Sequence, residues 1–281
     1  MKEIEKMLVS RDVHPEDTII KIDSVVIGEK RPVIIAGPCA VESKEQILSI
    51  AKELKSIGVD ILRGGCYKPR TSPYSFQGIG EEGLEFIIEA KKITGMPICT
   101  EIVSIDDISK FRDVDVLQIG SRNMQNFDLL KKVAKTNKPI LLKRGMSATY
   151  EEFLMAAEYI LKEGNPNVIL CERGIRTFET YTRNTLDLQA IPVLRRLTHL
   201  PIIVDPSHAA GKAFIVPAMA HASIAAGAEG LEIEVHNDIE NCMCDKEQAI
   251  SIEEMGNILK TLHNAWQSYV LGYIIRLNGL F

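Results

Sequence analysis

Short runs of apolar, mostly β-branched residues recur along the chain, and longer amphipathic segments separate them at intervals of roughly 25 to 35 residues. Eight such runs are predicted to be strands: Val33–Ala36, Ile61–Arg63, Pro97–Thr100, Val116–Ile119, Ile140–Lys143, Val168–Cys171, Ile202–Asp205 and Gly230–Glu234. Continuous apolar strands that alternate with helices are typical of a parallel sheet covered by helices. Eight repeats predict an α/β protein with a closed (β/α)8 TIM barrel rather than an open sheet.

Helix start and stop signals support this pattern. Ser43 and Thr149 are predicted N-caps, and glycines follow the ends of the predicted helices. The clearest helices are predicted at Lys44–Ile57, Glu81–Thr94 and Tyr150–Glu163.

Two β-type segments, Thr18–Ile22 and Ser24–Ile27, flank Asp23 ahead of the first predicted barrel strand. They predict a small hairpin that plugs the N-terminal end of the barrel. No linker composition interrupts the chain. We therefore expect residues 1–30 to form a lead and a hairpin, and residues 31–281 to form the barrel.

The composition fits this architecture. The chain has 281 residues, 46% hydrophobic and 25% charged, and a single barrel needs about 250 residues. A mean hydropathy of +0.02 and the lack of an apolar run of about 18 residues argue against a membrane span. The charged N-terminus does not resemble a secretory signal, so we expect a cytoplasmic protein. The net charge of −5 argues against a nucleic-acid partner, and the six scattered cysteines indicate reduced thiols.

Barrel enzymes place their chemistry at the carboxyl ends of the strands. Eight cations follow those ends in a chain of net negative charge: Arg63, Lys68, Arg70, Arg122, Lys143, Arg144, Arg173 and Arg176. Converging lysines and arginines bind phosphate or carboxylate groups. Any one of them taken alone is equally well explained as a solvated loop charge. Arg144 and Arg176 are the expected bystanders, because each neighbours a better candidate.

A second group has metal-binding chemistry. Cys39, His208 and Glu234 end the first, seventh and eighth strands, and Asp245 follows in a loop. A thiolate, an imidazole and two carboxylates suit a borderline divalent ion such as Mn²⁺, Fe²⁺, Co²⁺ or Zn²⁺. A buried cysteine alone is usually a small apolar filler, but the Gly-Pro turn before Cys39 favours a ligand.

Two other patterns are predicted to be incidental. Gly78–Gly83 matches a dinucleotide-binding pattern, yet it follows a loop and places two carboxylates where a pyrophosphate would lie. Cys242 and Cys244, near His236, lack a second ligand pair with zinc-finger spacing. We expect them to be ordinary loop cysteines.

Four motifs together resemble those of 3-deoxy-D-arabino-heptulosonate 7-phosphate (DAHP) synthases, in particular the short type I beta subfamily. The resemblance spans about Thr18 to Leu262, and the motifs are Gly37–Ser43, Arg63–Gly65 with Lys68–Ser72, Asp205–His208 and Glu232–His236. It implies the first step of the shikimate pathway and of aromatic amino acid biosynthesis: phosphoenolpyruvate and erythrose 4-phosphate give DAHP and phosphate. The alternative is the sister family, the 3-deoxy-D-manno-octulosonate 8-phosphate synthases, which use arabinose 5-phosphate. That family typically has Ala-Asn-Arg-Ser where this chain has Lys68–Thr71, which favours the four-carbon sugar.

The resemblance also implies roles for individual residues. Phosphoenolpyruvate would be held by Arg63, Lys68, Arg122, Lys143 and Arg173. Arg70 and Thr71 would bind the phosphate of erythrose 4-phosphate, and Asp205 a hydroxyl group. The metal ligands would be Cys39, His208, Glu234 and Asp245. The ion would act as a Lewis acid on the sugar aldehyde, and Lys68 or a water at the metal would transfer protons.

Two other classes of function remain open at this stage. A Schiff-base aldolase would use Lys143 as its nucleophile. A non-catalytic sensor of phosphorylated metabolites would keep the cations but would not need Cys39 and His208.

Assembly and regulation are the last expectations. The segment Ile252–Leu277 carries an apolar run on nearly all its faces, which predicts a homodimer or homotetramer. The family's regulatory domains need roughly 70 to 90 residues, and only about 30 precede Val33. We therefore expect that phenylalanine, tyrosine and tryptophan do not inhibit the chain directly.

Overall fold

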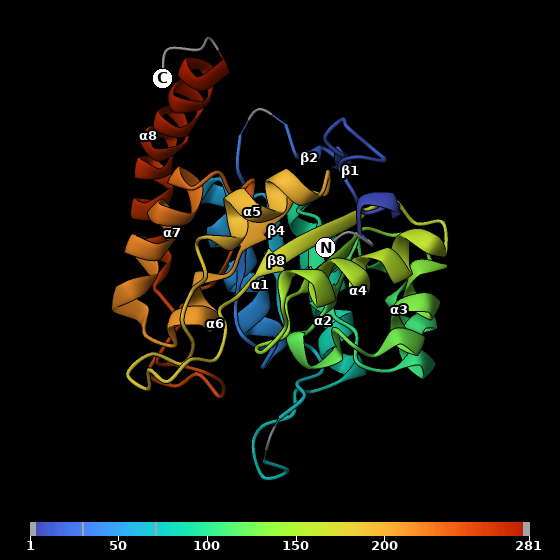
Figure 1. The fold of residues 1–281 in the computed structure, drawn as a ribbon. Helices are drawn as coiled ribbons and strands as arrows, with labels where there is room; N and C mark the ends of the chain where they lie inside the picture. The colour runs from blue at the N-terminus through green and yellow to red at the C-terminus, as the bar shows by residue number, and fades with distance from the viewer. Residues whose placement is uncertain (1–3, 30, 71, 278–281) are drawn as a thin grey trace.

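The computed structural model describes residues 4–29, 31–70 and 72–277, and residues 272–277 by their backbone alone. Eight parallel strands close into a barrel in the order β10-β3-β4-β5-β6-β7-β8-β9 (Figure 1). They are β3 (Val33–Gly37), β4 (Ile61–Arg63), β5 (Ile98–Glu101), β6 (Val116–Ile119), β7 (Ile140–Lys143), β8 (Val168–Glu172), β9 (Ile202–Val204) and β10 (Gly230–Glu234). The predicted (β/α)8 barrel is confirmed.

Helices surround the barrel on its outside (Figure 1). The α-helices are α1 (Lys44–Ile57), α2 (Glu81–Thr94), α3 (Phe127–Ala134), α4 (Tyr150–Lys162), α5 (Ala190–Leu197), α6 (Pro206–Ala210), α7 (Val216–Ala225) and α8 (Ile252–Leu277). Short 3-10 helices lie at η1 (Ile4–Lys6), η2 (Ile105–Asp113), η3 (Ser121–Asn123) and η4 (Ala213–Ile215). The connection from β5 to β6 departs from the repeat, because η2 replaces an α-helix there.

Local signals in the sequence fix the ends of the predicted helices. The Ser43 side chain accepts a hydrogen bond from the backbone N–H of Gln46, at 3.1 Å, and caps α1. Thr149 and Glu152 form a reciprocal capping box at the start of α4. Gly58 ends α1 in the left-handed conformation, which a glycine adopts without steric cost.

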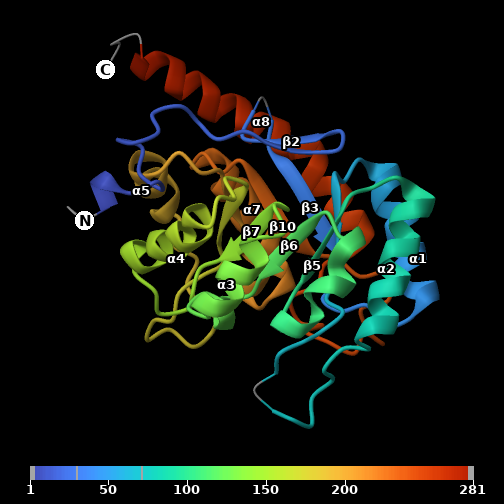
Figure 2. The same ribbon diagram turned by 90° about the vertical axis from the view of Figure 1, so that its right-hand side faces the viewer.

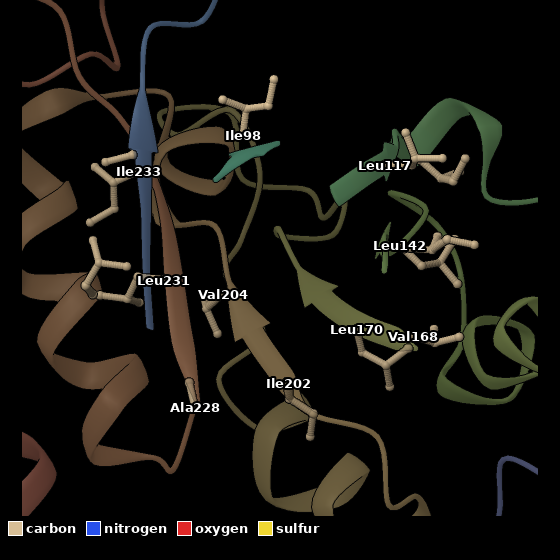
Figure 3. Packing of buried hydrophobic residues seen from close by; sticks show 14 of the residues in the cluster. Ile98, Leu117, Leu142, Val168, Leu170, Ile202, Val204, Ala228, Leu231 and Ile233 are labelled. Carbon is tan, nitrogen blue, oxygen red and sulfur yellow. The ribbon is translucent and has the colours of Figure 1, made fainter. Parts of the chain in front are cut away.

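The strands separate two apolar layers. Alternate residues of the strands face outward and pack against the helices, among them Ile98, Leu117, Leu142, Leu170 and Ile233 (Figure 3). Their neighbours along β3 to β9 face the barrel interior in a second cluster. Because both faces of each strand are buried, the strands have the continuous apolar sequences from which they were predicted.

The predicted hairpin is present as β1 (Ile20–Ile22) and β2 (Val25–Ile27), which are antiparallel, and Asp23 in their turn has a φ of +51°. The buried side chains of both hairpin strands belong to the interior cluster of the barrel. The hairpin thus plugs the barrel as predicted. The division of the chain at residue 30 into a lead and a barrel stays a prediction.

The first half of α8 packs on the barrel through Met255, Ile258 and Leu262, which are all buried. The second half extends beyond α7 and away from the barrel (Figures 1 and 2). The side chains of Tyr273, Ile274 and Ile275, part of the predicted apolar run, lie outside the described residues. Among the helices described, none is both long and apolar enough to cross a membrane.

Candidate active site

A cavity with a volume of about 270 Å³ opens at the carboxyl ends of the barrel strands. Six of the eight predicted cations line it: Arg63, Lys68, Arg70, Arg122, Lys143 and Arg173. His208 and Asp245 line it as well. The residues at the strand ends therefore meet in one place, as the barrel fold predicts.

The two expected bystanders are not among the residues that line this cavity. Arg144 is buried behind the rim, where its guanidinium pairs with Glu172 at 2.9 Å and with Asp187 at 2.8 Å. Arg176 is exposed and lies beside a separate hollow.

A buried network of charges forms the floor of the cavity. Arg63 donates to Glu234 at 2.7 Å and pairs with Glu232 at 3.2 Å. The ammonium group of Lys143 pairs with Asp205 and, at 3.0 Å, with Glu232. Although burial disfavours its charge, Asp205 and Glu232 raise the pKa of Lys143. Lys143 is therefore protonated, which disfavours its use as a Schiff-base nucleophile.

Arg173 supplies positive charge that the described protein atoms leave partly unpaired. Its side chain is 4% exposed, and its Nη1 atom has no hydrogen-bond partner among the residues described. Burial lowers the pKa of this guanidinium, although an arginine stays charged at neutral pH. A buried, unsatisfied donor that lines a cavity is a position for an anionic ligand.

Lys68 and Arg70 come from the long connection between β4 and α2. The Lys68 ammonium donates to the carbonyl oxygen of Cys39 at 3.0 Å. Gly65 makes room for it, because a Cβ atom there would lie 2.6 Å from Cδ of Lys68. Burial opposes the charge of Lys68, but Cys39 and nearby acids raise its pKa, so it is an acid rather than a base. Thr71, the other predicted phosphate ligand, lies outside the described residues.

Three of the four predicted metal ligands form one cluster. Ligand atoms of His208, Glu234 and Asp245 lie within 4.8 Å of one another. The Nδ1–H of His208 donates to Asp205 at 2.6 Å, and its Nε2 lies 3.2 Å from Glu234 Oε1. Burial lowers the pKa of His208, so the neutral ring that metals prefer is present at neutral pH.

The fourth predicted ligand, Cys39, belongs to an adjoining cluster with Cys244 and Asp245, whose ligand atoms also lie within 4.8 Å of one another. The two sulfur atoms are 3.0 Å apart, and Cys39 Sγ is 3.5 Å from Asp245 Oδ2. The hydrogen bond to Cys244, together with burial, raises the pKa of Cys39, whereas the same bond and the charges of Lys68 and Arg70 lower the pKa of Cys244. Asp245 therefore connects the two clusters.

This donor set fits a borderline divalent ion. It combines an imidazole nitrogen, thiol sulfur and two carboxylates. The carboxylate of Asp205 holds the far nitrogen of His208, an arrangement found around most metal-binding histidines. Gln248 holds the second oxygen of Glu234 at 2.5 Å.

The structure also shows cavity residues that the sequence analysis did not single out. Glu101 ends β5, and burial raises the pKa of its carboxyl group. Gly120 leaves room for this carboxylate, because a Cβ atom there would lie 2.0 Å from Glu101 Oε1 and would displace it. Arg183 lines the cavity from the long loop after β8 and lies 3.4 Å from Asp245. Glu101 is the last residue of a strand and was open to prediction, whereas the position of Arg183 carries no local signal.

Comparison with known proteins gives the family. The family model described as the DAHP synthetase I family matches residues 15–268. The chain belongs to this family. It is 53% identical over 247 residues to the phospho-2-dehydro-3-deoxyheptonate aldolase of Thermotoga maritima, and the match covers 88% of this chain and 73% of that protein.

Solved structures agree with this assignment. The Thermotoga maritima DAHP synthase superposes with a TM-score of 0.89 at 50% identity, over 92% of this chain and 76% of that one. A 2-dehydro-3-deoxyphosphooctonate aldolase of Geobacter sulfurreducens is 31% identical over 263 residues, 86% of this chain and 96% of that protein. These similarities confirm the predicted family, the barrel fold and the enzymatic activity as a DAHP synthase, with the octulosonate enzymes as more distant relatives.

Proposed function

We propose that this cavity condenses phosphoenolpyruvate with erythrose 4-phosphate beside a divalent ion held by Cys39, His208, Glu234 and Asp245. The observation that carries the proposal is that six predicted cations line one cavity together with His208 and Asp245, which belong to the two ligand clusters that also hold Cys39 and Glu234. The two substrates are anions that repel each other in water. Bringing them together in a cationic site supplies much of the catalysis.

Phosphoenolpyruvate binds on the floor and the adjoining wall of the cavity. Arg63 and Lys143 are already paired with buried carboxylates, so Arg173 and Arg122 contribute most of the uncompensated positive charge. A phosphate or carboxylate oxygen satisfies the unpaired Nη1 of Arg173 with a charge-assisted hydrogen bond. Lys68 lines the same cavity and donates to the ligand as well.

Erythrose 4-phosphate enters from the mouth of the cavity, where Arg70 binds its phosphate. Asp205 was predicted to bind a hydroxyl group of the sugar. Its carboxylate is fully buried and accepts from His208 and Lys143, so we propose that it also orients these two side chains.

A divalent ion held by these residues would supply Lewis-acid chemistry, making the aldehyde more open to attack by a weak carbon nucleophile. C3 of phosphoenolpyruvate then forms the new bond to the aldehyde carbon. The protonated Lys68 gives a proton to the aldehyde oxygen. Water adds to C2 and loses one proton. The C2–O bond to the phosphate group then breaks, and inorganic phosphate takes up the second proton as C2 becomes a carbonyl carbon. Glu101, a cavity carboxyl with a raised pKa, is placed to accept the first proton.

A direct experiment follows phosphoenolpyruvate loss and phosphate release with erythrose 4-phosphate, before and after removal of metal. The variant Cys39→Ala is expected to lose bound metal while it keeps the circular dichroism spectrum and cooperative melting of the barrel. Full activity in metal-free protein would contradict the proposed metal site.

A further inference from the structure

Cys244 lies against the proposed metal ligands, although the sequence pattern predicted an ordinary loop cysteine. Its sulfur is 3.0 Å from Cys39 Sγ, and the residue is 4% exposed. Its neighbour in the chain, Asp245, has ligand atoms in both clusters of the site. Cys244 therefore shares a cluster with two of the four proposed ligands, Cys39 and Asp245.

The loop that carries Cys244 is anchored to another part of the barrel. The backbone N–H of Met243 donates to the side chain of Glu42 at 2.8 Å. Asp245 has a φ of +50°, and this left-handed backbone lets the consecutive side chains of Cys244 and Asp245 both reach the cluster. By contrast, Cys242 is only half-buried, and its thiol contacts the carbonyl oxygen of Cys244 at 3.6 Å.

A positively charged side chain lies beside the sulfur of Cys244, so its surroundings favour the negatively charged thiolate. Arg70 donates to Cys244 Sγ at 2.9 Å and to Asp245 Oδ1 at 3.4 Å. A guanidinium group thus already lies beside this sulfur and this carboxylate. A divalent ion shared with Cys39 would balance the same charges and would release Arg70 toward the sugar phosphate.

We propose that Cys244 is an additional ligand of the divalent ion, so that the site presents two thiolates instead of one. This inference rests on the metal site of the proposed function. Thiolates are soft ligands, and a second one favours thiophilic ions such as Zn²⁺ and Cd²⁺ over Mn²⁺, which prefers oxygen and nitrogen. The loop around Cys244 thereby sets the metal preference of this enzyme.

The test uses Co²⁺, whose bonds to thiolates absorb in the near ultraviolet. Reduced, metal-free protein is loaded with one equivalent of Co²⁺ without oxygen, for the wild type, Cys244→Ser, Cys39→Ser and the matched control Cys242→Ser. We expect Cys244→Ser to retain Co²⁺ but lose about half of the thiolate-to-cobalt band, because it removes one of two sulfur ligands. Cys39→Ser should bind little Co²⁺, as expected for Cys39→Ala. The control keeps the full band.

Two measurements make the outcome independent of any one variant. X-ray absorption of the wild-type cobalt protein should give two sulfur ligands per ion. Competition dialysis gives the ratio of Cd²⁺ affinity to Mn²⁺ affinity for each protein. This ratio should be about 10-fold or more higher in the wild type than in Cys244→Ser, because substitutions around a metal site change metal affinity by that order.

The possible results separate this inference from the proposed function. One sulfur per cobalt, with an unchanged band in Cys244→Ser, overturns the role of Cys244 and leaves the four-ligand site standing. Failure of the wild type to retain Co²⁺ overturns both.

Discussion

Glu232 holds together the charges on the floor of the cavity, and its replacement gives a quantitative test of the buried network. Its carboxylate is 1% exposed and lies 3.2 Å from Arg63 and 3.0 Å from Lys143. Removing one partner of a buried ion pair costs about 3–5 kcal/mol. In Glu232→Gln each cation keeps a second carboxylate, Glu234 or Asp205, so we expect the free energy of unfolding to fall by ~3 kcal/mol.

A loss of ~3 kcal/mol lowers the melting temperature of a chain of this size by roughly 6–12 °C. The matched control is Glu247→Gln, because Glu247 makes a 2.9 Å ion pair with Lys212 but is 72% exposed. Exposed pairs contribute about 0–1 kcal/mol, so this variant should melt within a few degrees of the wild type. Both are measured by thermal and urea unfolding of ligand-free protein.

Phosphoenolpyruvate provides a second readout on the same variants. In Glu232→Gln one carboxylate fewer competes with the added anion for Arg63 and Lys143. The ligand should therefore raise the melting temperature of Glu232→Gln more than that of the wild type. This account of the cavity floor would be refuted if Glu232→Gln and the wild type had the same melting temperature. It would also be refuted if Glu232→Gln and Glu247→Gln lost the same stability.

Three further expectations concern binding, specificity and assembly. Arg173→Ala should lower kcat/KM for phosphoenolpyruvate by about 10- to 100-fold, because a hydrogen bond to a charged group contributes about 1.5–3 kcal/mol. Steady-state kinetics measures this, with Arg176→Ala, at an exposed position, as the control. Equal losses of activity in the two variants would count against this role of Arg173. Erythrose 4-phosphate should exceed arabinose 5-phosphate by about 10- to 100-fold in kcat/KM, and equal efficiency with the two sugars would argue for the octulosonate reaction. The second half of α8 extends beyond the barrel and Leu271 on it is 60% exposed, so light scattering should give a dimer or tetramer, and a monomeric mass at micromolar concentration would overturn that expectation.

The strands were predictable because the barrel buries both of their faces. Ile61–Arg63, Val116–Ile119 and Gly230–Glu234 have the same bounds in the structure as in the sequence analysis. The predicted strand Ile202–Asp205 runs one residue too far. The Asp205 side chain accepts from the backbone N–H of His208 at 2.9 Å, so this residue caps α6 instead of continuing the sheet.

The site was predictable only where it follows strand ends. Arg63, Lys143 and Glu234 are placed by the strands themselves, whereas Cys244 and Arg183 come from long connections. The course of such a loop depends on contacts between distant segments, such as the bond between Met243 and Glu42. No local pattern encodes those contacts, and this is why Cys244 was interpreted as an ordinary loop cysteine.

The central claim is that one cavity joins the two substrates with the help of a divalent ion. The most direct measurement records phosphoenolpyruvate consumption and phosphate release with erythrose 4-phosphate in three samples: protein as purified, protein stripped with EDTA, and stripped protein given Mn²⁺. The account predicts equal amounts of substrate consumed and phosphate released, no turnover after stripping, and recovery with Mn²⁺ or another first-row divalent ion. Undiminished turnover in protein shown by elemental analysis to be metal-free would contradict it.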